Sequence, residues 1–335
     1  MRKKCGDGSV KIELPQDLKN INDCIDYINE NKCDYIWLDA GDSEESIVLD
    51  FLYKIKHVEK VRKIKLNGNI EITDVLYRFS ELEELAYYVS SNAEIDTERF
   101  PNIREICTTK AHQLKNLEKT PISDYAQFDN GRIDPIIMKK LKGVVDLSLH
   151  GPKDFSFDYI ENPEKLKITF LTECNIKNLR GIERMRNLHL LCLTCCRSIS
   201  SIEGISKVSN LKKLRIDSCP KLEDISEIKN LENLKLLILE NIKKCDLSFL
   251  EEMKCTQSLE CLVLRNCGSI PSIKFFERYP KLQCFDFLYT NIIDGDLTPC
   301  LRLKEANTFN KRHYNLKDTQ LPDSGGFGEW WLKED

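Results

Sequence analysis

Cysteine and histidine are the residues of this chain whose types and spacing could support chemistry. The 335 residues include 15 cysteines and 5 histidines. Cys192 and Cys195 form a C-x-x-C pair, the spacing of a structural zinc site, but zinc needs a second pair of ligands. The sequence has no other C-x-x-C and no pair of histidines, so we predict no metal site. These cysteines, together with Cys196, are expected in the core or on a strand surface.

A catalytic thiol needs a base within reach and a group that orients the base. His189 is near these cysteines in the chain, but it follows an apolar position and no orienting carboxylate is evident. The other histidines are scattered along the chain at His57, His112, His150 and His313. The glycine-rich stretch 325–328 follows no predicted strand and opens no helix, so it does not form a phosphate-binding loop. We therefore predict no catalytic residues, no cofactor and a protein that is not an enzyme.

The overall composition limits the kind of partner. The net charge is −4, with 41% hydrophobic and 31% charged residues, which gives no bulk attraction for nucleic acid or anionic lipid. Residues 1–8 are basic but lack the apolar run of a secretory signal, and no stretch approaches the roughly 18 apolar residues of a membrane span. We expect a cytoplasmic protein with reduced cysteines, no nucleic-acid or membrane partner, and a monomeric state.

One apolar pattern organises most of the chain. The spacing L-x-x-L-x-L-x-x-C marks four turns, which begin at Leu166, Leu188, Leu211 and Leu259, and clear turns without the final cysteine also begin at Leu234 and Leu282. Subtracting neighbouring starts gives steps of 22, 23, 23, 25 and 23 residues. A fainter continuation runs back through Val144, Ser123, Ile103, Leu82, Val61 and Cys33, with Ser123 the weakest start because its inward sites would be Ala126 and Phe128. About twelve turns result, and a thirteenth strand is possible around 301–303.

The pattern predicts a solenoid. In each turn a short strand points alternate side chains inward, and strands of successive turns pair in parallel, about 4.8 Å apart. A second apolar series with three-residue spacing, such as Ile199–Ile202–Ile205, suits a short helical or 3₁₀ segment on the opposite, convex side. The residue eight positions after the first leucine ends the strand, and Cys174, Cys196 and Cys219 fit there as weak S–H donors.

The ends of the chain differ from the repeats, because an open end would expose the core. Val10–Ile12–Leu14 predicts a strand, and Pro15 then opens a helix with Leu18, Ile21, Ile25 and Ile28 on one face. Residues 47–55 predict a longer convex helix. We assign residues 1–32 to an N-terminal cap, 33–300 to the repeat array and 301–335 to a C-terminal cap and tail, within one continuous domain. Trp330 and Trp331 either fold back onto the last turn or form a mobile tail.

These motifs resemble those of the leucine-rich-repeat superfamily, particularly its short-repeat cytosolic and bacterial branches. The resemblance rests on the six strong turns and on the Asn-Leu pairs that open turns at Leu188, Leu211 and Leu234. It covers residues 144–300 well and 33–143 loosely. It implies an α/β solenoid, a horseshoe with a concave parallel β-sheet, and binding of other macromolecules through that face. Pro152, Ile242 and Thr290 depart from the pattern at the eighth position.

The outward strand positions give the predicted binding face. They include aromatic and arginine side chains, which are enriched at interface hot spots. Apolar residues such as Ile168, Leu190, Leu236, Ile238, Val263 and Leu288 also fall on outward positions and would form a patch larger than a monomer usually exposes. The residues predicted to contact a partner are Tyr35, Trp37, Asp39, Lys63, Lys65, Glu84, Tyr88, Tyr125, Asp146, His150, Phe170, Arg215, Asp217, Glu240, Arg265, Asp286 and Tyr289.

The neighbouring outward cysteines Cys261 and Cys284 should lie within disulfide reach, about 5 Å between Cα atoms. Two reduced thiols side by side are favoured in a cytoplasmic protein.

The sequence thus favours a non-enzymatic binding protein that grips another protein, since mixed charges along the face suit a protein better than a polyanion. A narrower hypothesis is a bacterial immunity protein that neutralises a toxin. An adaptor or regulatory scaffold subunit is the alternative, and an enzyme with a repeat-built site is a third class.

Overall fold

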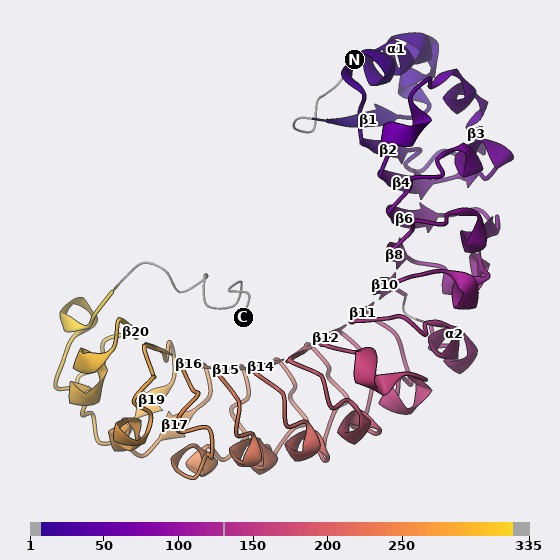
Figure 1. Ribbon diagram of the computed structural model, residues 1–335. Helices are drawn as coiled ribbons and strands as arrows, with labels where there is room; N and C mark the ends of the chain where they lie inside the picture. Colours follow the sequence, from indigo (N-terminus) through magenta and orange to yellow (C-terminus); the bar gives the residue numbers. More distant parts are fainter. Residues whose placement is uncertain (1–7, 130, 324–335) are drawn as a thin grey trace. The chain divides into compact units, whose positions relative to one another are not determined.

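The computed structural model describes residues 8–129 and 131–323 as two compact units. The first unit holds residues 8–129 and 134–147, and the second holds residues 131–133 and 148–323. In each unit the chain coils so that one strand per turn joins a parallel sheet, with short helical segments behind it (Figure 1).

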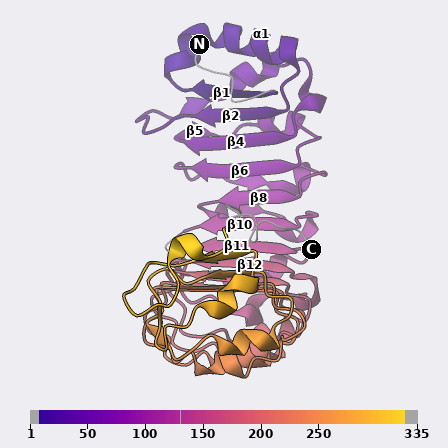
Figure 2. The same cartoon turned by 90° about the vertical axis from the view of Figure 1, so that its left-hand side faces the viewer.

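The first unit begins with strand β1 (Ser9–Glu13) and helix α1 (Ile21–Asn31). The strands that continue its sheet are β2 (Tyr35–Asp39), β4 (Lys63–Gly68), β6 (Glu84–Val89), β8 (Glu105–Thr108) and β10 (Asp124–Phe128). Each pairs in parallel with the next. Figure 2 shows β1, β2, β4, β6 and β8 lying one after another along the sheet. Helix α2 (Pro135–Lys140) follows β10, and β11 (Asp146–His150) spans the boundary between the units.

The second unit repeats the same strand more regularly. Its main strands are β12 (Ile168–Thr172), β13 (Leu190–Thr194), β14 (Lys213–Asp217), β15 (Leu236–Glu240), β16 (Cys261–Arg265), β18 (Cys284–Asp286) and β20 (Glu305–Asn307). They pair in parallel in chain order, and residues at equal positions of successive turns are register partners. The motif leucines therefore stack on one another, as Leu191, Leu214 and Leu237 do, all fully buried.

The return segments behind the sheet are short. Most are 3₁₀ turns such as Ile182–Arg184 and Ile205–Lys207, which agrees with the three-residue apolar spacing. Two-residue strands form small parallel pairs: β3 (Ile47–Val48) with β5 (Ile70–Glu71), β7 (Ile95–Asp96) with β9 (Leu114–Lys115), and β17 (Ser269–Ile270) with β19 (Asn291–Ile292). The prediction of a longer helix at residues 47–55 was wrong, since β3 and the 3₁₀ turn Asp50–Lys54 occupy this stretch.

A left-handed bend follows each of the strands β12, β13, β14, β15, β16 and β18 of the second unit. The residue seven positions after the motif leucine has a positive φ, for example 54° at Ser218 and 56° at Asn241. The bend turns the next side chain into the core. Cys196 Sγ then lies 3.3 Å from the carbonyl oxygen of Leu171 one turn back, and Cys267 Sγ lies 3.0 Å from that of Leu239. The buried thiols thus act as weak donors to backbone groups at the strand ends.

The described residues at the two ends are built differently from the repeats. At the first end the 3₁₀ turn Gln16–Asn20 precedes α1, so Leu18 is exposed while Ile25 and Ile28 are buried. At the other end the thirteenth strand is β20, at Glu305–Asn307 rather than 301–303, because the 3₁₀ turn Thr298–Arg302 occupies the earlier position.

Beyond β20, the Pro322 carbonyl accepts a 2.8 Å hydrogen bond from the N–H of Ala306 in that strand. Trp330 and Trp331 lie outside the described residues. No helix in the described ranges has the length and apolar character required to cross a bilayer.

The open face of the parallel sheet

The main strands present two faces, and we call the one turned away from the core the open face. In β14, Leu214 and Ile216 are fully buried in the core, whereas Lys213, Arg215 and Asp217 are half-buried on the open face. The same alternation places Tyr35, Trp37 and Asp39 of β2 on the open face. It also places there the predicted residues Lys63, Lys65, Glu84, Tyr88, Asp146, His150 and Phe170.

In the first unit, aromatic and cationic side chains alternate across neighbouring strands of the open face. Lys11 Nζ lies 4.3 Å and Lys65 Nζ lies 4.1 Å from the ring centroid of Trp37. Lys65 Nζ also lies 5.5 Å from the ring of Tyr88. A cation over an aromatic face is attracted by the ring quadrupole. We call these four residues the Trp37 cluster.

The cluster is held on both sides by polar contacts. Lys11 Nζ pairs with Asp39 at 2.8 Å, and this side-chain hydrogen bond raises the pKa of Lys11. The Tyr88 hydroxyl donates to Cys107 Sγ at 2.9 Å. Phe128 packs edge-on against Tyr88, with ring centroids 6.2 Å apart. These contacts support the rings and the cations in one arrangement on the open face.

Beside the cluster the open face is hollowed by a cavity of about 400 Å³. Its polar lining includes Tyr35, Lys63, Lys65, Glu84 and Glu105. Lys63 and Glu84 form an ion pair across β4 and β6, so this floor carries both signs of charge.

A group of carboxylates follows on the next strands of the first unit. Glu105 and Asp124 are register partners on β8 and β10. Burial raises the pKa of Asp146 to about 6, and the charges of Asp124 and Glu105 add to the shift. The pKa of Glu105 is also raised, first by burial and then by Glu84 and Asp124.

The predicted register was wrong for the turn that begins at Ser123. Tyr125 is 2% exposed and points into the core, where its hydroxyl donates to Gln127 Oε1 at 3.0 Å. Asp124, Ala126 and Phe128 occupy the open face instead. Tyr125 is therefore a core residue and leaves the predicted contact set. The reason is that this strand buries a hydrogen-bonded Tyr–Gln pair, which the apolar pattern does not reveal.

In the second unit, a row of charges crosses the open face of β14, β15, β16 and β18. Arg215 Nη2 lies 2.6 Å from Glu240 Oε2, and Arg265 Nη1 lies 3.4 Å from Glu240 Oε1. Arg265 also donates two hydrogen bonds to Asp286, from Nε to Oδ1 at 2.9 Å and from Nη2 to Oδ2 at 2.6 Å. The carboxylates of Glu240 and Asp286 are buried, with side chains 11% and 1% exposed. Both arginines are about one-third exposed.

Asp217 extends this row. Burial opposes its ionisation, but hydrogen bonds from Asn241, Ser218 and Arg215 outweigh that effect and lower the pKa of Asp217. Asn241 Nδ2 donates to Asp217 Oδ1 at 3.0 Å, and Asn266 Nδ2 donates to Asn241 Oδ1 at 2.7 Å. The charge row is thus continuous with the polar side chains of the strand-end bends.

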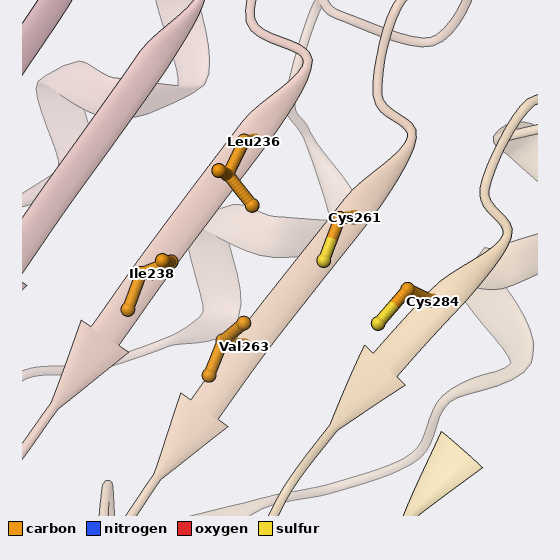
Figure 3. Close-up of a cluster of buried hydrophobic side chains, with 5 residues drawn as sticks. All are labelled: Leu236, Ile238, Cys261, Val263 and Cys284. Atoms are coloured by element: carbon orange, nitrogen blue, oxygen red, sulfur yellow. The ribbon is translucent and has the colours of Figure 1, made fainter. Parts of the chain in front are cut away.

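An apolar group of side chains lies beside the charge row on the open face. Figure 3 shows Leu236 and Ile238 on β15, Cys261 and Val263 on β16, and Cys284 on β18. We call these five residues the apolar patch. They are 0–5% exposed. Cys261 and Cys284 are register partners, as expected, and both are free thiols, but they are buried rather than on the surface.

The remaining predicted residues are less connected. His150 Nε2 lies 3.7 Å from Glu173 Oε2. Tyr289, at a strand-end bend, is 66% exposed, and its ring centroid lies 4.3 Å from that of Phe309.

Sequence reasoning missed Lys11, Cys107 and Phe128. The first was assigned to a cap, although β1 pairs with β2 and makes Lys11 the register partner of Trp37. The second is the fourth position after Ile103, so the repeat phase alone could have identified it.

The three neighbouring cysteines of the turn from Leu188 point in different directions. Cys192 faces the open face, Cys195 occupies a left-handed bend and Cys196 points into the core. Within residues 8–129 and 131–323, no three His, Cys, Asp or Glu side chains gather closely enough to hold a metal ion.

The repeated strand, left-handed bend and short return segment define the chain as a leucine-rich-repeat fold. Among solved structures, it is similar to an internalin, InlF, from Listeria monocytogenes, with a TM-score of 0.58, 16% identity, and coverage of 88% of this chain and 90% of that one. Internalin C2 from the same organism gives a TM-score of 0.47 at 20% identity, over 59% of this chain and 84% of that one. A leucine-rich-repeat protein from Leptospira interrogans gives a TM-score of 0.38 at 13% identity, over 90% of this chain and 88% of that one. No protein-family model matches the sequence, and no curated protein matches it.

Proposed function

We propose that this chain is a non-enzymatic binding protein that recognises a protein partner through the open face of its sheet. The observation that carries the proposal is the Trp37 cluster. Trp37, Tyr88, Lys11 and Lys65 are pre-organised by mutual contacts on an open sheet face, and aromatic anchors of this kind dominate protein interfaces. Side chains already fixed lose little conformational entropy on binding.

The charge pattern supports a protein partner rather than a polyanion. The cluster's lysines alternate with Asp39, Glu84 and Glu105 on the same face. Binding to a phosphate backbone needs a continuous cationic stripe, because affinity comes from neutralising many phosphates. A protein surface of complementary mixed charge fits this face better.

The test is a comparison of matched aromatic variants. The tagged full chain is expressed in cells, and the partner that co-purifies with it is identified. The affinity of the chain for that purified partner is then measured by calorimetry. Trp37→Ala with Tyr88→Ala should weaken binding at least 30-fold, since hot-spot truncations cost about 2 kcal/mol or more each. Tyr53→Ala is the control, because Tyr53 is 52% exposed on a return segment behind the sheet.

Equal affinity of the double variant and the control would refute the open face as the binding site. Recovery of no partner under these conditions would count against the function itself.

More narrowly, we propose a cytoplasmic, monomeric immunity protein of a bacterium, whose binding neutralises a toxin. The cysteines of residues 8–129 and 131–323 are all free, including the adjacent Cys261 and Cys284, and this suits a reducing compartment. Loss of the recovered partner's toxic activity on binding would support this role. Unchanged activity would favour the alternative, an adaptor or scaffold subunit.

A further inference from the structure

The cavity in the first unit has a floor of short side chains. Ala86 of β6 and Cys107 of β8 are register partners, and both line the cavity of about 400 Å³. On β10 the register partner of Cys107 is Ala126, which continues the row of short side chains along the open face. Longer side chains on either side of this row therefore stand above it.

The two sides of this row differ in chemistry. Two positions earlier on the same strands lie three carboxylates, Glu84, Glu105 and Asp124, which are register partners in turn. Two positions later on β6 and β10 lie Tyr88 and Phe128, whose rings are in edge-on contact. Residues two positions apart on a strand are separated by about 6–7 Å. A group that lies over the short side chains can therefore reach a carboxylate on one side and an aromatic ring on the other.

The chain itself does not neutralise these carboxylates. Glu84 pairs with Lys63, whereas in the described part of the chain no hydrogen bond or ion pair reaches the carboxylates of Glu105 and Asp146. Strands β8, β10 and β11 contain no lysine or arginine. Burial and the neighbouring carboxylates raise the pKa of Glu105 and of Asp146, and Lys63 offsets this only in part at Glu105. This stretch of the open face thus carries an excess of negative charge.

We propose that a basic segment of the protein partner docks on the open face of β6, β8 and β10, with an arginine side chain over Ala86 and Cys107. This proposal rests on the binding function proposed above, and it adds the charge of the segment that the partner presents. We call Ala86, Cys107, Glu105, Asp124 and Tyr88 the acidic hollow.

Arginine fits the acidic hollow better than lysine because of its shape. Its planar guanidinium group has five N–H donors, which can serve two neighbouring carboxylates such as Glu105 and Asp124. The same plane can stack on the ring of Tyr88, whose hydroxyl is held by its 2.9 Å hydrogen bond to Cys107 Sγ. A lysine ammonium group is a compact, strongly hydrated charge and lacks this planar face.

The charge balance argues against a neutral or acidic partner segment. Such a segment would remove water from Glu105, Asp124 and Asp146 without supplying a cation, and a carboxylate buried without a partner is strongly unfavourable. A basic segment instead relieves the repulsion between these carboxylates and supplies the opposite charge. Lys65 does not take this role, because its Nζ lies 4.1 Å from the ring of Trp37 and 5.5 Å from that of Tyr88.

Binding of an arginine peptide tests the proposal without knowledge of the partner. The probe is fluorescein-labelled hexa-arginine, and its affinity for the full chain is measured by fluorescence anisotropy at low ionic strength, where charges are weakly screened. Glu105→Gln with Asp124→Asn should weaken this affinity about tenfold or more, because both changes keep the side-chain shape and remove the charge. Hexa-lysine, with the same charge, should bind the wild type about threefold or more weakly than hexa-arginine.

The matched control removes the same charge elsewhere on the chain. Asp26 and Glu30 are exposed on helix α1, so Asp26→Asn with Glu30→Gln should change the affinity for hexa-arginine less than about twofold. Equal weakening by the two pairs of changes would show that only net charge matters and would overturn the proposal. Equal affinity of the wild type and the Glu105 and Asp124 variant would overturn it as well, and equal affinity for hexa-lysine would overturn the choice of arginine.

The affinity for the purified partner separates this proposal from the proposed function. Trp37→Ala reports on the proposed function, because Trp37 lies outside the acidic hollow. If Trp37→Ala weakens partner binding and Glu105→Gln with Asp124→Asn does not, the basic segment is refuted while the open face remains the binding site. If both weaken it about tenfold or more, and salt weakens binding less steeply in the carboxylate variant alone, the basic segment is supported.

Discussion

Replacing Leu214 by aspartate puts a carboxyl group between two stacked layers of leucine. Leu214 is 0% exposed, and its register partners Leu191 and Leu237 are equally buried. Loss of the side chain alone costs about 2–5 kcal/mol, and burial of an unpaired polar group adds about 1–3 kcal/mol. The expected loss is therefore about 3–8 kcal/mol, a large part of the 5–15 kcal/mol that stabilises a typical domain.

The assay is urea denaturation followed by circular dichroism, with Arg215→Ala as the matched control one residue away. Arg215 lies on the open face, where it pairs with Asp217 and Glu240. Without Arg215, Glu240 keeps its contact with Arg265. Asp217 keeps its bonds from Ser218 and Asn241. The control should lose only about 1 kcal/mol or less.

Acid should partly rescue Leu214→Asp, because a buried carboxyl group folds more readily when protonated. Equal losses at the two positions would show that the inward–outward register is wrong. A stable Leu214→Asp protein would contradict the packed core itself.

Two other perturbations probe the electrostatics of the open face. Asp146→Asn should stabilise the protein by about 1–2 kcal/mol at pH 7, after allowance for solvent screening, because the pKa of Asp146 is raised from 3.8 to about 6. An acid with a raised folded pKa destabilises the fold above that pKa. The wild type should therefore gain stability as the pH falls from about 6 to 3.8, and the asparagine variant should lack this gain in urea titrations. Arg265→Ala should cost about 3–5 kcal/mol by thermal unfolding, since it leaves the Asp286 carboxylate, 1% exposed, without its bidentate partner. Arg265→Lys should recover only part of this loss, and full recovery would show that charge rather than bidentate geometry matters.

The sequence predicted the strand positions wherever the repeat motif is complete enough to fix the register of each turn. From Leu166 to Leu282 the motif leucines mark the strands because period-two alternation and a fixed repeat length agree. The class of fold and the position of most open-face residues follow from that agreement. The boundaries of short elements do not, since β20 and the return segments depend on local hydrogen bonds between turns.

The assignment of side chains to the core or to the open face failed where polar and apolar residues no longer alternate along the strand. In β10 the buried Tyr125 and Gln127 satisfy each other, so the alternation of polar and apolar residues is lost. In β15 all five residues are buried, including Glu240 on the open face. There the alternation could place the side chains on the two faces but could not reveal that the side chains of both faces are buried. Three of the four residues of the Trp37 cluster were predicted, and Lys11 was missed because it belongs to a strand outside the repeat count.

The left-handed bends bear on how this surface can vary between related chains. Six successive turns place a residue other than glycine there: Glu173, Cys195, Ser218, Asn241, Asn266 and Tyr289. Each such residue costs about 1–2 kcal/mol that glycine would save. Glycine would, however, remove a side chain from the rim of the sheet. Asn241 and Asn266 already link across this rim, and Tyr289 projects from it. The rim is thus a second row of interchangeable side chains, where sequence drift can change what the protein touches while the leucine stack beneath stays constant.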